Sequence, residues 1–307
     1  MLSKEIRILE FDESVSAQKK LIQHYNPKIV DLTALGPRVR LWMDKKGAIK
    51  VRQALDPTLK NSITFLGSGD FHHISIPLIE QFEQPLSVIV FDHHPDWFVS
   101  PPALGCGSWV SEVLKRKNIK KLVSLGPSSD DLNNSSMFTA DTASFKGNRL
   151  EIYPYQRSLT RAFLKKIPDN ISFKRKRTLF YDEICWQQLK DKNLEVFLVS
   201  LIERLPTKQV YISIDKDCLK KQYSLTNWEE GNFSLDELLL MLKAIKGRLD
   251  IVGLDITGDY SFPKVSGMIR SFVSRQDHPQ EYSAKGMDLE LVTSLNEDTN
   301  IKILELF

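Results

Sequence analysis

The sequence predicts a three-layer αβα fold around a mostly parallel sheet of roughly eight strands. First, short runs rich in branched apolar residues alternate with helix-like segments throughout the 307 residues, which is typical of a doubly wound sheet. Second, runs such as VIVF at 88–91 and YISI at 211–214 are apolar on both faces, as expected for strands covered by helices on both sides. The alternation resumes after one long polar segment, 128–148, which we expect to be a loop. We therefore expect a single domain over residues 1–307.

The individual elements follow from the spacing of the apolar residues. Four segments have helical periodicity, at 108–117, 194–205, 234–246 and 284–295. Ser234 followed by Glu237 is a capping-box pattern, and it predicts where the third of these helices begins. The expected strands are short apolar runs, at 6–11, 29–32, 63–67, 87–92, 121–125, 150–153, 210–215, 251–255 and 301–306.

Composition and charge exclude several classes of function. The 42 basic and 39 acidic residues nearly balance, and the basic stretches are scattered between apolar residues, so we expect no nucleic-acid partner. No apolar stretch approaches the roughly 20 residues that span a bilayer, and the first residues lack a signal-peptide pattern, so we expect no membrane association. The three cysteines, Cys106, Cys185 and Cys218, are too dispersed for a disulfide framework or a zinc site. A cytoplasmic location is therefore expected.

Acidic and histidine residues gather where the expected strands end. In an open α/β sheet, ligands bind beyond the carboxyl ends of the strands. The run ITFLG leads into Ser68-Gly69-Asp70-Phe71-His72-His73, LSVIVF ends in Asp92-His93-His94-Pro95-Asp96, VYISI ends in Asp215-Lys216-Asp217, and DIVGL ends in Asp255, with Asp259 soon after.

These residue types indicate a site for two divalent cations. Alternation along an extended chain puts Asp92, His94 and Asp96 on one side, and it does the same for Asp215 and Asp217. Four converging carboxylates would repel one another strongly, and two divalent cations would balance their charge. Mixed carboxylate and imidazole ligands suit Mn²⁺, Fe²⁺, Co²⁺ or Zn²⁺ better than Ca²⁺ or Mg²⁺. A metal pair can also supply a hydroxide nucleophile at neutral pH. Each motif alone is more often a chance occurrence in a loop, but all three at strand ends, in this order, are harder to dismiss.

Together these segments resemble the ureohydrolase superfamily of arginases and agmatinases. The resemblance covers roughly residues 62–306, and the segments that carry it are Gly69–His72, Asp92–Asp96, Ser213–Asp217, Thr226–Gly231 and Gly253–Ile256. It implies an arginase-like fold, a pair of manganese ions, a small-molecule substrate and a possible homo-oligomer.

The resemblance also implies a ligand set. One metal would be held by His72, Asp92, Asp96 and Asp215, and the other by Asp92, His94, Asp215 and Asp217, with Asp92 and Asp215 bridging. His73 is an alternative to His72, because Phe71 interrupts the Asp-His pair of the family. His93 is expected to point away and pack. Asp70 is expected to orient a neighbouring histidine or a loop amide, and Ser213 is also expected to act as a supporting residue behind the ligands.

Three departures from the family pattern put a plain arginase in doubt. Cys106-Gly107-Ser108 stands where the family has its catalytic histidine, so Cys106 is either a substitute proton carrier or nucleophile, or a small pocket residue. The glutamate that contacts the substrate guanidinium in the family would fall at Gly258, and Asp259 could reach the same place. Lys220 and Lys221 replace an Asp-Pro pair. Thr226, Asn227 and Trp228 are candidates for binding the substrate.

The sequence therefore predicts a binuclear metal-dependent hydrolase of a linear C–N bond in a guanidino, formimidoyl or related amide compound. The absence of the family's histidine at Cys106 leaves a second hypothesis open, a metal- or ligand-binding arginase homologue that has lost hydrolysis. A third alternative is deacetylase-like amide hydrolysis on a related fold, for which a single zinc ion would be expected.

Overall fold

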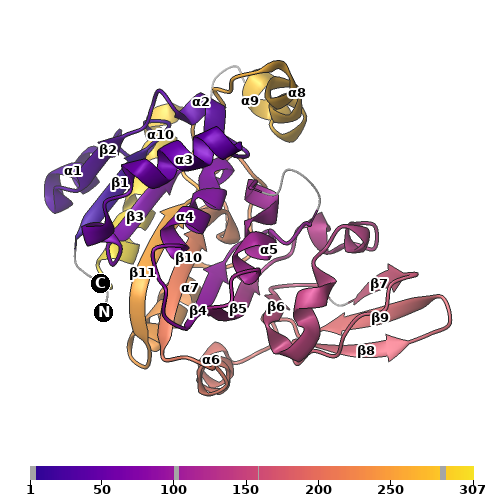
Figure 1. Ribbon diagram of the computed structural model, residues 1–307. Coiled ribbons are helices and arrows are strands. Elements are labelled where there is room, and N and C mark those ends of the chain that lie inside the picture. The colour runs from indigo at the N-terminus through magenta and orange to yellow at the C-terminus, as the bar shows by residue number, and fades with distance from the viewer. Residues whose placement is uncertain (1–4, 100–103, 158, 284–287) are drawn as a thin grey trace.

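The computed structural model describes residues 5–99, 104–157, 159–283 and 288–307. Its centre is an eight-stranded, fully parallel sheet, which confirms the predicted fold class (Figure 1). The strands are β1 (Ile6–Glu10), β2 (Lys28–Asp31), β3 (Ile63–Gly67), β4 (Leu86–Phe91), β5 (Ile119–Gly126), β6 (Leu150–Pro154), β10 (Gln209–Asp215) and β11 (Asp250–Thr257). Their order across the sheet is β2-β1-β3-β11-β10-β4-β5-β6. The acidic and histidine motifs of the sequence therefore lie in or just after the four strands in the middle of the sheet, β3, β11, β10 and β4.

Helices cover both faces of the sheet because alternate strand residues point to opposite sides. In β4, Val88 and Val90 join one apolar cluster, while Ile89 and Phe91 join the other. The first cluster is covered by α3 (Lys45–Ala54), α4 (Ser75–Ile79) and α5 (Trp109–Leu114). The second is covered by α1 (Lys19–Tyr25), α6 (Leu194–Glu203), α7 (Leu235–Lys246) and α10 (Leu289–Leu304). The short helix α2 (Gly36–Val39) adds Val39 to the first cluster. Two further helices, α8 (Met268–Asp277) and α9 (Pro279–Ser283), contribute no residue to either cluster (Figure 1).

Most predicted boundaries agree with the structure within two or three residues, and the capping box is present at Ser234 and Glu237. The strand predicted at 301–306 is wrong, because these residues continue α10. Ile303 and Leu304, near the end of α10, pack into the second apolar cluster. A short apolar run cannot by its spacing distinguish a strand from the buried end of a helix. Residues 284–287 of the predicted 284–295 helix lie outside the described residues. The helix itself begins at Leu289, after the Asp288 cap.

A second, antiparallel sheet was not predicted from the sequence. Its strands are β7 (Leu159–Phe163), β8 (Phe173–Arg177) and β9 (Tyr181–Trp186), in the order β7-β9-β8. Only one face of β7 is buried, in strict alternation, and Phe173 and Trp186 pack against Phe145. Phe145 comes from the expected loop 128–148, which consists of short 3₁₀ turns rather than longer elements. This loop and the second sheet therefore stabilise each other.

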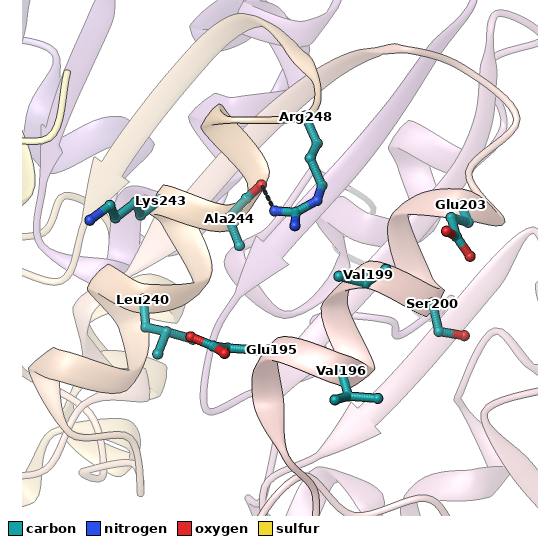
Figure 2. Close-up of a pocket in the computed structure, with 9 residues that line it drawn as sticks. All are labelled: Glu195, Val196, Val199, Ser200, Glu203, Leu240, Lys243, Ala244 and Arg248. Atoms are coloured by element: carbon teal, nitrogen blue, oxygen red, sulfur yellow. Dashed lines mark hydrogen bonds between the residues drawn. The ribbon is translucent and has the colours of Figure 1, made fainter.

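A wide groove separates α6 from α7 on the outer surface (Figure 2). Val196, Val199 and Leu240 line it, with charged side chains such as Glu203 and Arg248 at its margins. Its volume is about 930 Å³, but its lining shares no residue with the acidic cavity described below. None of the described helices is long and apolar enough to cross a membrane.

Candidate metal centre

The predicted ligands come together at the carboxyl edge of the central strands. His72 lies on the 3₁₀ turn Gly69–Ile74 after β3, and Asp92 follows β4 directly. Asp215 is the last residue of β10, and Asp217 lies in the turn Lys216–Cys218 that follows. Because β3, β11, β10 and β4 are neighbours and run parallel, their carboxyl ends meet in one crevice. The geometry therefore brings together side chains that lie up to 145 positions apart in the sequence.

A first group of ligand atoms surrounds His72. Its Nδ1 atom lies 3.2 Å from Asp92 Oδ2, 3.2 Å from Asp96 Oδ2 and 3.5 Å from Asp215 Oδ2. All four side chains are buried. Asp96 has a left-handed backbone, with φ of 47°, a conformation that aspartate tolerates better than most residues. The Trp109 indole donates a hydrogen bond to its Oδ2 at 2.7 Å. His72, Asp92 and Asp96 could hold one cation.

A second group shares Asp92 with the first. His94 Nδ1 lies 2.8 Å from Asp217 Oδ2 and 3.7 Å from Asp92 Oδ1. Asp92, His94 and Asp217 could hold a second cation next to the first. Asp215 reaches the first group through Oδ2, while its Oδ1 accepts from the Asp217 amide at 3.0 Å. Five of the six predicted ligands thus line one cavity, and the sixth, His72, contacts three of them from behind it. Metal binding by these residues stays a prediction.

The electrostatics of this cavity favour positive charge. Burial and the neighbouring carboxylates raise the pKa of Asp92 well above its usual range, and burial and Asp217 raise the pKa of Asp215 to about 8. Burial alone would lower the pKa of His72, but Asp92 and Asp96 outweigh it and raise the pKa. Among the residues that the structure describes, His72 Nδ1 and Asp92 Oδ2 are buried without a hydrogen-bond partner. Cations would satisfy these atoms and replace the shared protons, so the donor set fits two divalent ions.

Hydrogen bonds to the Nε2 atoms orient the imidazole rings of His72 and His94. His72 Nε2 lies 2.8 Å from Ser213 Oγ, and Ser213 donates in turn to Asp255 Oδ1 at 2.6 Å. His94 Nε2 lies 3.1 Å from Glu229 Oε2. These contacts leave each Nδ1 facing the carboxylates, as histidine ligands to metals generally require. Ser213 thus lies where a supporting residue is expected. Glu229 was missed, because an acidic residue in a loop carries no spacing signal.

The two alternative histidines lie away from the ligand atoms. His73 is completely buried, and burial lowers its pKa to about 3, so it packs as a neutral side chain. His93 is also buried, and its own pKa is lowered by burial. The geometry therefore favours His72 over His73 as a ligand, and it agrees with the expectation that His93 packs.

Asp70 belongs to a separate buried cluster, which holds the loop around Trp228. Its Oδ2 accepts from Arg40 Nε at 2.5 Å, and its Oδ1 lies 2.9 Å from His278 Nε2 and 3.1 Å from Trp228 Nε1. Burial alone would raise the pKa of Asp70, but Arg40 and His278 hold it below its usual range. Asp70 thus orients a histidine and a loop side chain, although the histidine is His278 rather than one of the predicted metal ligands.

We expect His278 to make the stability of the protein depend on pH. Its Nδ1 faces the Asn227 carbonyl at 3.1 Å and its Nε2 faces Asp70, so both nitrogens must donate and the ring must be protonated. Burial alone would lower the pKa of His278, but Asp70 outweighs it and raises the pKa above 6.5. Because the folded-state pKa is raised, the protonated His278 ring stabilises the folded protein fully at pH values below the unfolded-state pKa. This stabilisation is lost as the pH rises through the folded-state pKa.

The test is urea unfolding of the wild type and of His278→Gln between about pH 6 and pH 9. The free energy of unfolding that separates the two proteins should shrink as pH rises. A difference that stays constant over this range would contradict the doubly donating imidazolium.

All the predicted ligands except His72 line a cavity of about 250 Å³, which Cys106 and Trp228 also line. Cys106 lies in the 3₁₀ turn Cys106–Ser108, and burial together with the nearby aspartates raises the pKa of its thiol well above 9.0. It is therefore protonated at neutral pH and is not an activated thiolate. Two further carboxylates, Asp131 and Asp277, line the same cavity. They were missed because one lies in the 128–148 loop and the other ends α8.

Asp259 does not line this cavity, so the substrate contact expected of it is wrong. Its side chain is 1% exposed, and its Oδ1 lies 2.6 Å from Lys216 Nζ. Gly258 has a φ of 85°, and a Cβ there would lie 2.4 Å from Asp215 Oδ1, so neither a glutamate nor any other side chain fits at this turn. The turn directs Asp259 away from the ligands and toward Lys216.

Of the three expected substrate-binding residues, only Trp228 lines the cavity. Thr226 Oγ1 exchanges hydrogen bonds with the backbone of Trp228. Asn227 is buried, where it accepts from Ser68 Oγ at 2.9 Å and donates to the Ser261 carbonyl. Thr226 and Asn227 therefore shape the loop that presents Trp228, which corrects the direct contacts expected of them.

Comparison with known proteins agrees with this fold. The Arginase family model matches residues 14–258, and the chain belongs to this family. An uncharacterized protein from Thermotoga maritima is 29% identical over 197 residues, which cover 64% of this chain and 58% of that protein. This chain thus matches little more than half the length of that relative.

Solved structures of the same fold come from several family members. Arginase from Bacillus caldovelox superposes with a TM-score of 0.57 at 14% identity, covering 98% of each chain. Formimidoylglutamase from Bacillus subtilis gives 0.56 at 14% identity, over 98% of this chain and 86% of that one. Proclavaminate amidino hydrolase from Streptomyces clavuligerus gives 0.56 at 12% identity, over 100% and 92%. These similarities confirm the three-layer fold.

Proposed function

We propose that this protein is a hydrolase that cleaves a linear C–N bond in a guanidino, formimidoyl or related amide compound, with two divalent cations, preferably Mn²⁺. The observation that carries the proposal is the pair of ligand groups that share Asp92 at one end of a small cavity. The similar solved structures include an arginase, an amidino hydrolase and a formimidoylglutamase, and these names support the proposed classes of bond. The three free cysteines are consistent with a cytoplasmic location.

In this proposal, one set of residues binds the cations and another set binds the substrate. His72, Asp92, Asp96 and Asp215 would hold one cation, and His94 and Asp217 would complete the second site with the shared carboxylates. When bound, such a pair supplies a nucleophile from water at neutral pH and polarises the group under attack.

The remaining cavity residues are suited to a cationic substrate. The carboxylates of Asp131 and Asp277 can accept hydrogen bonds from substrate nitrogens, in the role expected of Asp259. Trp228 forms a flat wall, and its ring lies 5.5 Å from that of His94. The neutral thiol of Cys106 can donate a hydrogen bond but does not supply a base.

The proposal is tested by measuring urea and ammonia release from a panel of guanidino, formimidoyl and amide compounds with Mn²⁺-loaded protein. Asp215→Asn is the control, because it removes the charge of a carboxylate that lies beside both groups. We expect the wild type to release urea or ammonia from at least one cationic compound, and Asp215→Asn to release neither. If protein with two bound Mn²⁺ ions per chain releases nothing from the whole panel, the proposed activity is wrong.

A second candidate function is supported by Cys106 alone. A neutral thiol at the position of the family's catalytic histidine is consistent with a protein that binds metal and ligand without turnover. If the wild type is inactive on the panel and Cys106→His is active with unchanged metal binding, the chain is a homologue that has lost hydrolysis. Activity of the wild type that Cys106→His leaves unchanged would exclude this candidate.

A further inference from the structure

The metal cavity opens into a second, larger cavity with a different character. This vestibule has a volume of about 530 Å³ and shares Phe98, Cys106, Gly107 and Asp277 with the metal cavity. The rest of its lining is mostly apolar, and Asp277 is the only charged residue among the described residues that line it. The remaining lining residues are Leu41, Trp42, Gly105, Ser108, Ile269 and Val273.

One wall of the vestibule is a regular stripe along α8. Ile269, Val273 and Asp277 are four residues apart, so they lie on one face of the helix. The stripe is apolar over its first two positions and ends in a carboxylate at the border with the metal cavity. The next residue, His278, contacts Asp70 and the Asn227 carbonyl, so the acidic end of the stripe is fixed in place.

The opposite wall is also fixed before any ligand binds. Leu41 is buried, and the Trp42 ring lies under the Arg270 guanidinium at 4.3 Å. Arg270 Nη2 also donates to the Trp42 carbonyl at 3.1 Å. Trp42 further forms a β-bridge with Gly105, next to Cys106. The vestibule therefore presents a preformed apolar surface, which lowers the entropy lost when an apolar group binds.

We propose that the vestibule binds an alkyl or aryl body of the substrate, while the cationic nitrogen next to that body meets Asp277 at the entrance to the metal cavity. This inference rests on the proposed function and narrows it to cationic compounds with an apolar tail. A substrate with a charged amino-acid end would have to place that end among apolar side chains, where a charge has no partner to compensate its lost hydration.

The first test measures binding, so it does not depend on turnover. We would titrate Mn²⁺-loaded protein with n-alkylammonium ions from methyl to octyl by calorimetry, because these ions lack a bond that the proposed reaction could cleave. Affinity should rise up to about fourfold for each methylene added, until the vestibule is filled. Val273→Thr, which puts a hydroxyl on the wall without changing its shape, should flatten this rise.

The matched control is Val199→Thr, the same change on the half-buried wall of the groove between α6 and α7 (Figure 2). It should leave the dependence on chain length unchanged. Affinity that is independent of chain length in the wild type would overturn the vestibule proposal. So would a dependence that Val273→Thr and the second wall variant Ile269→Ser both leave intact.

A parallel series of n-alkylguanidines separates this inference from the proposed function. Hydrolysis whose kcat/KM rises with chain length would support both. Hydrolysis with no dependence on chain length would overturn the vestibule alone. Chain-length-dependent binding of alkylammonium ions, without hydrolysis of any guanidine, amide or formimidoyl compound, would support the vestibule and overturn the proposed reaction.

Discussion

Asp92→Asn should remove high-affinity binding of both cations and reduce turnover by at least about a thousandfold, a loss of roughly 4 kcal/mol in transition-state stabilisation. Asp92 is the residue that the two ligand groups share, and its oxygens face His72 on one side and His94 on the other. Asparagine keeps the shape but lacks the charge that holds a divalent cation. Calorimetric titration with Mn²⁺ should therefore fall from two ions per chain to none at micromolar concentrations.

The same variant should be more stable than the wild type when no metal is present. Asp92 is buried among carboxylates that raise its pKa. A carboxyl group whose pKa is raised by folding lowers the free energy of unfolding at neutral pH, and asparagine removes this destabilising effect. Added Mn²⁺ should then reverse the order, because ligand at about 100 times its dissociation constant stabilises the wild type by about 2.7 kcal/mol per site. Thermal unfolding with and without Mn²⁺ measures both effects.

The matched control for Asp92 is Asp131→Asn. Asp131 lines the same cavity but belongs to neither ligand group. Its replacement should leave the binding of two ions intact and weaken only cationic substrates. If Asp92→Asn still binds two Mn²⁺ ions with the affinity of the wild type, the shared-carboxylate arrangement is wrong.

Lys216→Met should destabilise the metal-free protein by about 3–5 kcal/mol, because it leaves a buried carboxylate without its partner. Lys216 and Asp259 are essentially inaccessible to solvent, and their charged atoms are 2.6 Å apart. Gln18 Nε2 also donates to Asp259 at 2.7 Å, but an amide cannot neutralise the charge. The double variant Lys216→Met/Asp259→Leu should recover much of the loss, since an apolar pair of similar volume needs no compensation.

Urea unfolding measures these free energies, and Lys221→Met provides the control. Lys221 also pairs with an acidic residue, Glu230 at 3.2 Å, but its side chain is 72% exposed. Removing an exposed pair should cost at most about 1 kcal/mol. Equal effects of the two lysine changes, or a double variant no more stable than Lys216→Met, would contradict the buried ion pair.

Much of the candidate metal centre could be predicted because its signals are local. The ligands His72, Asp92 and Asp215 lie at or just after strand ends, and those strands are recognisable from short apolar runs. Neighbouring parallel strands bring their carboxyl ends to one edge, so strand-end residues meet without further information. Lys216, between two predicted ligands, begins the 3₁₀ turn that follows β10, and there its side chain pairs with Asp259 instead of joining the ligand atoms.

The residues that surround the predicted ligands could not be predicted in the same way. Asp131, Glu229 and Asp277 come from a loop of 3₁₀ turns, from an irregular segment and from the end of α8. The spacing of apolar residues does not predict where such segments lie in the fold. Their positions depend on contacts such as that between His278 and Asp70, which are 208 residues apart in the sequence. The role expected of Asp259 was wrong for a similar reason, because the turn at Gly258 directs its side chain toward Lys216.

The sequence by itself thus determined the layered parallel fold and predicted six ligands for the candidate site, because strand periodicity and strand-end placement act over a few residues. Only the tertiary structure decided which side chains line the cavity of this site and how that cavity adjoins the apolar vestibule along α8. Those features arise where loops and helix ends from distant parts of the chain pack together. Their geometry follows from the packing of the whole molecule rather than from any local pattern.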